Sequence, residues 1–402
     1  MCGCPWRCWR RTDRVDAGLS KAPDIELSTL DVPRDRLAAR LYRGVLLWTW
    51  RRLYFGRVHV IGRLPTQPGT LYLSTHRNGG IDAALADFAA GGLPVPVAAS
   101  QITRSLWGRW TGCIEVVRAT DHERHGHVAD GNDPLADALA RLAAGESLLW
   151  FPEGTSDGGP KLLSIKRGAA RLLDAAAKQG IAVRVVVMGI HYQEMDALQS
   201  DVDVEVTEPS DLQVAALATI AADGRANEVQ HRIETALRAV SIEYPDAASQ
   251  NDIELLGARS DLPIVDSRRA LLRLPQLQVH EWAQRAQAGS GTLPIRATPW
   301  LLPWASAAIV WLPALMVAIA ATRHASRNNK AFIRSLLAMV LIPFNIVLSS
   351  WMLGMLGLRW QMAVPLTMLL LALGLVAHRQ LRRARSQTRS MRSLRAEMTT
   401  YL

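Results

Sequence analysis

The chain has 402 residues, of which 49% are hydrophobic and 20% are charged, and its net charge is +10. This length exceeds one average domain, so the chain can bury a full core and still spare about 80 residues. Its four cysteines, at positions 2, 4, 8 and 113, do not form two pairs at metal-binding spacing, and they do not support a disulfide framework.

The N-terminal part is divided into an irregular extension and a helix. Residues 1–35 are polar, and we expect no fold there and no export signal, because no apolar stretch of signal-peptide length is present. Three cysteines lie in this extension, which leaves attachment to a membrane through them open. Residues 36–56 look helical and place aromatic side chains among arginines. Such a helix either lies in the membrane interface or caps the core as an ordinary amphipathic helix.

Residues 57–245 alternate short β-branched runs with helical stretches, which is typical of an α/β fold with a mostly parallel sheet flanked by helices. Ligands of such sheets bind beyond the carboxyl ends of the strands, so the loops after Thr75, Ala119 and Phe151 are the expected site. We expect strands at 58–62, 70–75, 95–100, 113–119, 147–151 and 181–190, and helices at 81–90, 134–144 and 165–179.

A first cluster with chemical potential is STHRNGGIDAAL, residues 74–85. His76 directly follows an expected strand, and Asp82 opens an expected helix. Imidazole accepts a proton near neutral pH, and a carboxylate on its other nitrogen fixes the tautomer and stabilises the imidazolium. Taken alone, the pair fits a helix-capping aspartate beside a loop histidine better than it fits a catalytic pair.

A second cluster is FPEGTS, residues 151–156, which also follows an expected strand. Pro and Gly favour a tight turn, and its backbone N–H groups, with the Thr155 and Ser156 hydroxyls, can cradle an anion. Glu153 is suited to bond a hydroxyl or to orient an arginine. Positive charge for a phosphate is available downstream, although such residues are more often solvated: Lys161, Lys166 and Arg167.

Two further segments contain possible ligands. Arg118 ends the segment GCIEVVR, residues 112–118, and a guanidinium grips phosphate bidentately, although a strand-end arginine is usually structural. The histidines of DHERHGH, residues 121–127, have a spacing that zinc could use. That segment is polar and has no cysteine beside it, so we expect no metal site.

In their order, the three clusters resemble the motifs of the lysophospholipid and glycerol-phosphate acyltransferase family: His–Asp, then Gly…Arg, then Phe-Pro-Glu-Gly-Thr. The resemblance covers about residues 58–190, and FPEGTS is its specific part. It implies an α/β fold, with His76 as the general base and Asp82 as its partner. It also implies that the acceptor is held by Gly112, Arg118, Glu153, Gly154 and Thr155.

The sequence departs from the family pattern in two places. Five residues separate His76 from Asp82, where the common pattern has four, and the pair Gly79-Gly80 can absorb the extra residue because glycine reaches unusual backbone angles. A branch related to glycerol-3-phosphate and dihydroxyacetone-phosphate acyltransferases is similar in this spacing. The strand expected to contain the fourth motif, residues 183–190, has no proline, and we place no site residue there.

The resemblance implies an O-acyltransferase of phospholipid biosynthesis. Its donor is acyl-CoA or acyl-carrier protein, and its acceptor is a lysophosphatidate-like lipid, 1-acyl-sn-glycerol-3-phosphate, which gives phosphatidic acid. Glycerol-3-phosphate, dihydroxyacetone phosphate and another lysolipid remain alternative acceptors. No cofactor is expected beyond the thioester co-substrate, and the lack of a Gly-x-Ser-x-Gly elbow argues against an acyl-enzyme. A non-catalytic membrane scaffold is the alternative from another class, and the intact motif residues argue against it.

The C-terminal part, after a mainly helical linker region at 246–296, is predicted to lie in a membrane at 297–378. Three runs lack charged residues: 297–322, 335–358 and 360–377. A span needs about 20 apolar residues, so the last two are long enough, whereas the first contains three prolines and is either a kinked span or a re-entrant hairpin.

The basic tail, residues 379–402, includes seven arginines between positions 379 and 395. It follows an apolar run, which favours an anionic membrane face over nucleic acid as its partner. Basic flanks prefer the cytoplasm, so a re-entrant first run followed by two spans is the preferred topology. We therefore expect a multi-pass protein of the cell inner membrane with a cytoplasmic catalytic domain.

Overall fold

The computed structural model describes residues 44–45, 54–62, 68–91, 94–99, 113–116, 133–260, 262–288, 297–324, 327–385 and 389–401. The chain divides into two units, residues 1–33 and 34–402, and every described residue belongs to the second. The extension predicted at 1–35 therefore lies outside the described residues, as does most of the helix predicted at 36–56.

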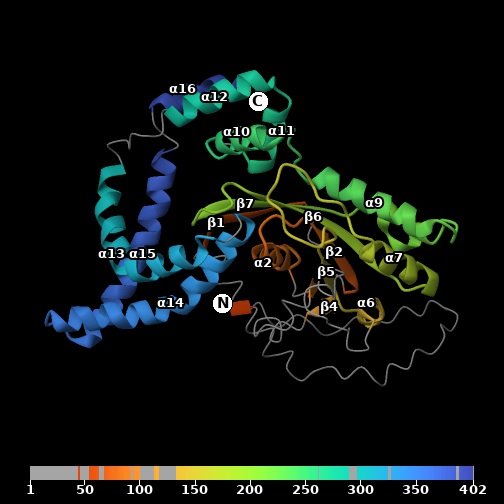
Figure 1. Ribbon diagram of the computed structural model, residues 1–402, viewed down its shortest axis with the longest axis horizontal. Coiled ribbons are helices and arrows are strands. Elements are labelled where there is room, and N and C mark those ends of the chain that lie inside the picture. Colours follow the sequence, from red (N-terminus) through yellow and green to blue (C-terminus); the bar gives the residue numbers. More distant parts are fainter. Residues whose placement is uncertain are drawn as a thin grey trace, which may run out of the picture. The chain divides into compact units, whose positions relative to one another are not determined.

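The described strands form one seven-stranded sheet in the order β1-β7-β6-β2-β5-β3-β4 (Figure 1). All neighbours pair in parallel except β6 and β7, which are antiparallel, so the prediction of a mostly parallel sheet is confirmed. The strands are β1 Phe55–Ile61, β2 Thr70–Ser74, β3 Val95–Ala99, β4 Ile114–Val116, β5 Leu148–Trp150, β6 Arg184–Tyr192 and β7 Ser200–Thr207.

Helices cover both faces of this sheet. Side chains alternate along a strand, so Leu71 and Leu73 of β2 lie in one core cluster and Tyr72 lies in the other. The first cluster is closed by α6 (Pro134–Ala143), α7 (Gly168–Gln179), the short α8 (Val214–Leu217) and α9 (Arg225–Val240). The second cluster is closed by α2 (Gly80–Ala89). The predicted His–Asp segment lies on this face of the sheet, because α2 contains Asp82.

The region after β7 is helical, as the sequence predicts. A 3-10 turn at Ser210–Leu212 and α8 and α9 are followed by α10 (Ala247–Gly257), α11 (Ile264–Leu272) and α12 (Gln276–Ala288). These last three helices build a separate cluster around the buried Trp282. The C-terminal helix α16 (Arg389–Thr399) adds Leu394 and Met398 to that cluster, so part of the predicted basic tail packs against the linker helices.

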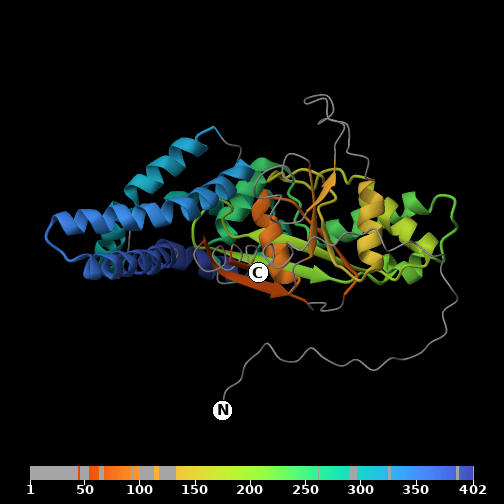
Figure 2. The same ribbon diagram turned by 90° about the horizontal axis from the view of Figure 1, so that it is seen from below.

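Three long helices contain the apolar runs: α13 (Thr298–Thr322), α14 (Arg327–Met355) and α15 (Trp360–Arg385). They contact one another, and both views show them grouped together (Figures 1 and 2). Within the described residues, one helix is long and apolar enough to cross a membrane, Trp360–Ala384, with a mean hydropathy of 1.8. A multi-span arrangement stays a prediction.

The buried His191 of β6 makes the fold sensitive to acid. Burial lowers the pKa of His191 to about 3, and the charges of Arg268, Arg269 and Arg77 act in the same direction. Below pH 6.5, the ordinary histidine pKa, His191 is therefore protonated in the unfolded chain but stays neutral in the folded chain. We expect stability to be full above that value and to decline towards pH 3, and we expect His191→Gln to reduce the decline. Thermal unfolding midpoints measured from pH 7 to pH 4 test this, and equal acid sensitivity in both proteins would refute it.

Candidate active site

His76 and Asp82 are in direct contact in the structure. His76 follows β2 at the carboxyl edge of the sheet, and its Nδ1 lies 2.9 Å from Oδ2 of Asp82. The Asp82 side chain is fully buried, whereas the imidazole is 17% exposed. A carboxylate only accepts hydrogen bonds, so Nδ1 carries the proton and Nε2 is the nitrogen with a lone pair. The structure thus brings together the pair that the spacing predicts.

The turn between the two residues depends on Gly79. This residue precedes α2 with φ 53° and ψ −140°, a conformation that residues with a Cβ avoid. After it, α2 begins within one residue, and Asp82 lies in the first helical turn, where the helix dipole favours a negative charge. The longer spacing is accommodated as the glycine pair predicts, and Gly79 supplies the unusual backbone angles.

Three donors hold the Asp82 carboxylate in place. Oδ2 accepts from the backbone N–H of Asn78 at 2.6 Å as well as from His76. Oδ1 accepts from the hydroxyl of Tyr192 at 2.5 Å. Burial raises the pKa of Tyr192, and the neighbouring Asp82 charge raises it further, so the phenol keeps the proton that it donates. Asp82 is therefore a fully hydrogen-bonded buried acceptor with a fixed direction towards His76.

Tyr192 was not expected among the site residues. It ends β6, just beyond residues 183–190, the strand expected to contain the fourth motif and no site residue. Its hydroxyl reaches Asp82 because β6 pairs with β2 in the sheet, which brings the ends of both strands to one edge. The hydrophobic run of β6 signals a buried strand, but only the pairing reveals what its last residue contacts.

The FPEGTS segment and the residue after it, Asp157, contact His76 in three ways. The Phe151 ring stacks on the imidazole, with 4.2 Å between the centroids and 24° between the planes. The backbone N–H of Asp157 donates to the carbonyl of His76 at 2.9 Å. Oε1 of Glu153 accepts from the backbone N–H of His76 at 2.7 Å. β2 and β5 are neighbours in the sheet, which is why the two motifs that follow them meet.

Glu153 is buried and joins two segments of the chain. Its Oε2 accepts from the backbone N–H of Leu163 at 3.1 Å, so both carboxylate oxygens bind main-chain donors. Burial raises the pKa of the Glu153 carboxyl, and the two backbone hydrogen bonds and the Arg77 charge oppose that rise. This structural role of Glu153 differs from the contact with the acceptor that the family resemblance implies. The contact with the acceptor stays a prediction.

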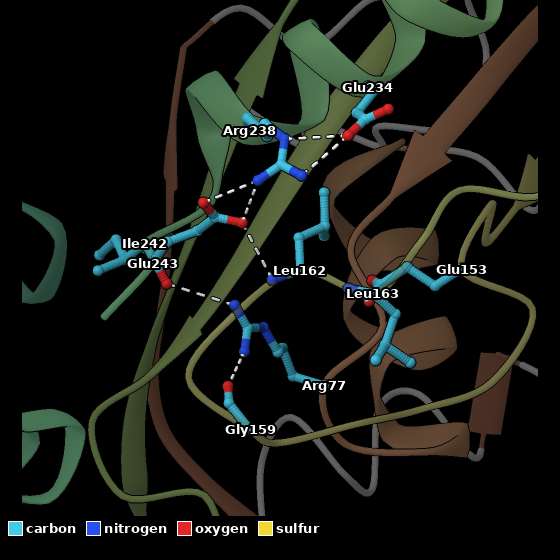
Figure 3. A network of polar contacts seen from close by, with 9 residues as sticks. All are labelled: Arg77, Glu153, Gly159, Leu162, Leu163, Glu234, Arg238, Ile242 and Glu243. Carbon is cyan, nitrogen blue, oxygen red and sulfur yellow. Dashed lines mark hydrogen bonds and ion pairs between the residues drawn. The ribbon is translucent and has the colours of Figure 1, made fainter. Parts of the chain in front are cut away.

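Arg77 fastens the same loop from the other side (Figure 3). Its guanidinium donates to the carbonyl oxygens of Gly159 and Ile242. The neighbouring Glu243 accepts from the backbone N–H of Leu162 at 3.1 Å and pairs with Arg238. These contacts hold the loop after β5 between the His76 segment and the end of α9, and so fix the position of the loop beside His76.

The remaining predicted residues have different outcomes. Gly154 has φ 73° and forms the turn, since its N–H donates to the Phe151 carbonyl at 3.0 Å. Thr155 is exposed at the same turn, where a ligand can reach it. Gly112 and Arg118 lie outside the described residues, and so do the histidines of 121–127.

The geometry supports proton abstraction from a hydroxyl. An imidazole whose Nδ1 is bonded to a buried carboxylate presents Nε2 as a base, and the Asp82 charge stabilises the imidazolium that results. This imidazole lies at the carboxyl edge of a mostly parallel sheet, where ligands of such folds bind.

Comparison with known proteins concerns the family of the domain that contains this site. Residues 57–209 match the family model described as Acyltransferase. A search of curated proteins gives no match. One similar solved structure is the 1-acyl-sn-glycerophosphate (LPA) acyltransferase PlsC from Thermotoga maritima, with 18% identity and a TM-score of 0.35, over 52% of this chain and 83% of that one. The assignment therefore rests on the family model and the motifs: residues 57–209 are an acyltransferase domain.

Proposed function

We propose that this protein transfers a fatty acyl group from a thioester to the hydroxyl of a glycerol-phosphate lipid, with His76 as the general base. The observation that carries the proposal is the 2.9 Å contact of His76 Nδ1 with the buried Asp82, at the carboxyl end of β2 and beside the FPEGTS turn. It is the arrangement that a base for a hydroxyl needs.

The reaction is a single displacement. His76 Nε2 takes the hydroxyl proton while the hydroxyl oxygen attacks the thioester carbonyl carbon. A carbon–oxygen bond forms, the carbon–sulfur bond breaks, and the thiolate leaves with the proton from the imidazolium. General base catalysis contributes about 10²–10⁴-fold, so the rest must come from holding both substrates in line.

The substrates are proposed from the motifs. The acceptor is 1-acyl-sn-glycerol-3-phosphate, held by Gly112, Arg118, Glu153, Gly154 and Thr155, and the donor is acyl-CoA or acyl-carrier protein. The thioester is a co-substrate, and no cofactor is required. Glycerol-3-phosphate, dihydroxyacetone phosphate and other lysolipids remain the alternative acceptors, because the five-residue spacing resembles their branch of the family.

The C-terminal helices are proposed to hold the enzyme at its lipid substrates. Large apolar side chains are exposed around the junction of α14 and α15, including Met355, Leu356 and Trp360, which are 73%, 84% and 74% exposed. Water penalises such exposure and a bilayer does not. Both α14 and α15 contact the acyltransferase domain. If the two helices form a hairpin that enters and leaves the membrane on the side of this domain, the basic segments lie on that side as well. The side would correspond to the cytoplasmic face of the membrane.

An assay of acyl transfer tests the proposal. Membranes containing the protein are supplied with labelled acyl-CoA or acyl-carrier protein and a panel of acceptors: lysophosphatidate, glycerol-3-phosphate, dihydroxyacetone phosphate and a lysolipid without a terminal phosphate. We expect product from a phosphate-bearing acceptor, lysophosphatidate above the others. No product from any acceptor with either donor would refute an enzymatic function and favour the scaffold.

Tyr192→Phe tests the hydrogen bond to Asp82. Removing this donor leaves the Asp82 carboxylate with two partners, the N–H of Asn78 and Nδ1 of His76, so its direction towards the imidazole is less firmly fixed. The rate at the optimum should fall about tenfold, because one of the three groups that orient Asp82 is lost. The matched control is Tyr72→Phe, a buried tyrosine whose hydroxyl donates to the Ala90 carbonyl. An unchanged rate in Tyr192→Phe, or an equal fall in Tyr72→Phe, would contradict the assignment.

A further inference from the structure

Gly80, the first residue of α2, is covered by a side chain from the C-terminal helices. A Cβ atom at Gly80 would lie 2.4 Å from Cε2 and 2.7 Å from Cζ of Phe332 in α14. Real Cβ atoms do not approach that closely, so the Phe332 ring fills the space that any larger residue at position 80 would need. Unlike Gly79, Gly80 does not have a left-handed φ, so its backbone conformation does not require glycine. The reason for glycine at this position is the space that the Phe332 ring occupies.

Phe332 packs into the core cluster of the active-site face. Together with Leu336 it lies against the cluster that includes Ile81 and Leu85 of α2. Gly80 and Ile81 are the two residues before Asp82, so the ring presses on the turn from which the carboxylate projects. Within the described residues, this makes α14 the C-terminal helix that contacts α2 most.

A second contact joins α15 to the same segment through the loop after β6. Arg382 pairs with Glu194 at 2.9 Å and donates to the carbonyl of Leu198 at 3.1 Å. In that loop, the carbonyl of Met195 accepts from the Asn78 side chain at 3.1 Å. Asn78 in turn donates its backbone N–H to Asp82. Two of the C-terminal helices therefore reach the segment 76–82, α14 directly and α15 through one loop.

We propose that Phe332 is a positioning residue for the His76–Asp82 pair, so that the C-terminal helices form part of the active-site scaffold as well as an anchor. The inference rests on the proposed function, since it assumes that His76 is the base. Phe332 acts by fixing the first turn of α2 and hence the direction of Asp82, since catalytic groups lose efficiency when their supporting packing is loose.

Three variants test the contact: Phe332→Ala, Gly80→Ala and the double variant. Alanine is a better helix former than glycine, so Gly80→Ala harms the protein only by displacing the ring. We expect Phe332→Ala to lower kcat about tenfold, with KM for donor and acceptor within about twofold, and Gly80→Ala to lower it at least as much. Because both changes remove one contact, the double variant should match Phe332→Ala within about twofold rather than multiply the losses.

The control is Phe344→Ala on the same helix, where the side chain is 70% exposed. Its kcat should equal that of the unaltered protein, with equal amounts of every variant in the membrane. An unchanged kcat in Phe332→Ala, multiplied losses in the double variant, or a rise in KM in place of the fall in kcat would overturn the inference. His76→Ala is assayed in membranes prepared in the same way. If this variant retains activity, the proposed function fails. If it is inactive, the results for the Phe332 and Gly80 variants test the positioning role of Phe332 separately.

Discussion

His76→Ala is expected to lower acyl transfer by at least about 10²–10⁴-fold, the contribution of a positioned general base. The imidazole is the group that presents a lone pair beside the FPEGTS turn, and alanine has no atom that can take a proton. The loss should appear in kcat with every acceptor that is used, because the base acts on the hydroxyl and not on the rest of the lipid. Initial rates with saturating donor and acceptor measure it.

The fold should survive this change, and the contacts explain why. Glu153 accepts from the backbone N–H of His76, not from the ring, so that hydrogen bond persists in the alanine variant. Asp82 keeps two of its three donors, the N–H of Asn78 and the hydroxyl of Tyr192. Equal thermal unfolding midpoints would confirm an intact fold, and full activity in a folded variant would exclude His76 as the base.

The sheet could be predicted largely from the sequence, because central strands such as β2 and β6 are short runs of β-branched and apolar residues. β7 is the strand that the prediction lacks, although Val202, Val204 and Val206 alternate with polar residues and are buried. Strict alternation indicates a strand with one polar face, so this signal was available. It is easily overlooked because only every second residue is apolar.

The partners of the site residues could not be predicted, because they depend on pairing between distant segments. The motif shows that Glu153 is present, but only the fold shows that it binds the N–H groups of His76 and Leu163. Likewise, Tyr192 reaches Asp82 across 110 positions. Spacing contains information about neighbours along the chain and none about such contacts.

The C-terminal helices show the same limit of sequence reasoning. Hydropathy locates the apolar run at 335–358, whereas α14 already begins at Arg327. The two differ because an apolar run stops at the first charged residue, while a helix can continue through charged residues. Those first residues of α14 include Phe332, which contacts the active-site helix. In the basic tail, Leu394 and Met398 are spaced by four and form the buried side of α16.

Asp82→Asn should lower kcat/KM by about 10²–10⁴-fold while the protein still folds. Asparagine has the same shape, and its amide oxygen can accept from both His76 Nδ1 and the Asn78 N–H. Its amide nitrogen then faces the Tyr192 hydroxyl, whose oxygen is also an acceptor. The three contacts can thus be kept, the one with Tyr192 in the reversed direction, and the lost quantity is the negative charge. Asp82→Ala is less informative, because it leaves buried donors without an acceptor and destabilises the protein.

Thermal unfolding and activity, measured together, distinguish a lost charge from a damaged fold. The contacts of position 82 can be kept in Asp82→Asn, so we expect an unfolding midpoint close to that of the unaltered protein together with the loss of kcat/KM. That combination assigns the loss to the missing negative charge, which can no longer stabilise the imidazolium of His76. Near-full activity in a folded Asp82→Asn variant would exclude a role of Asp82 in holding the charge of the base.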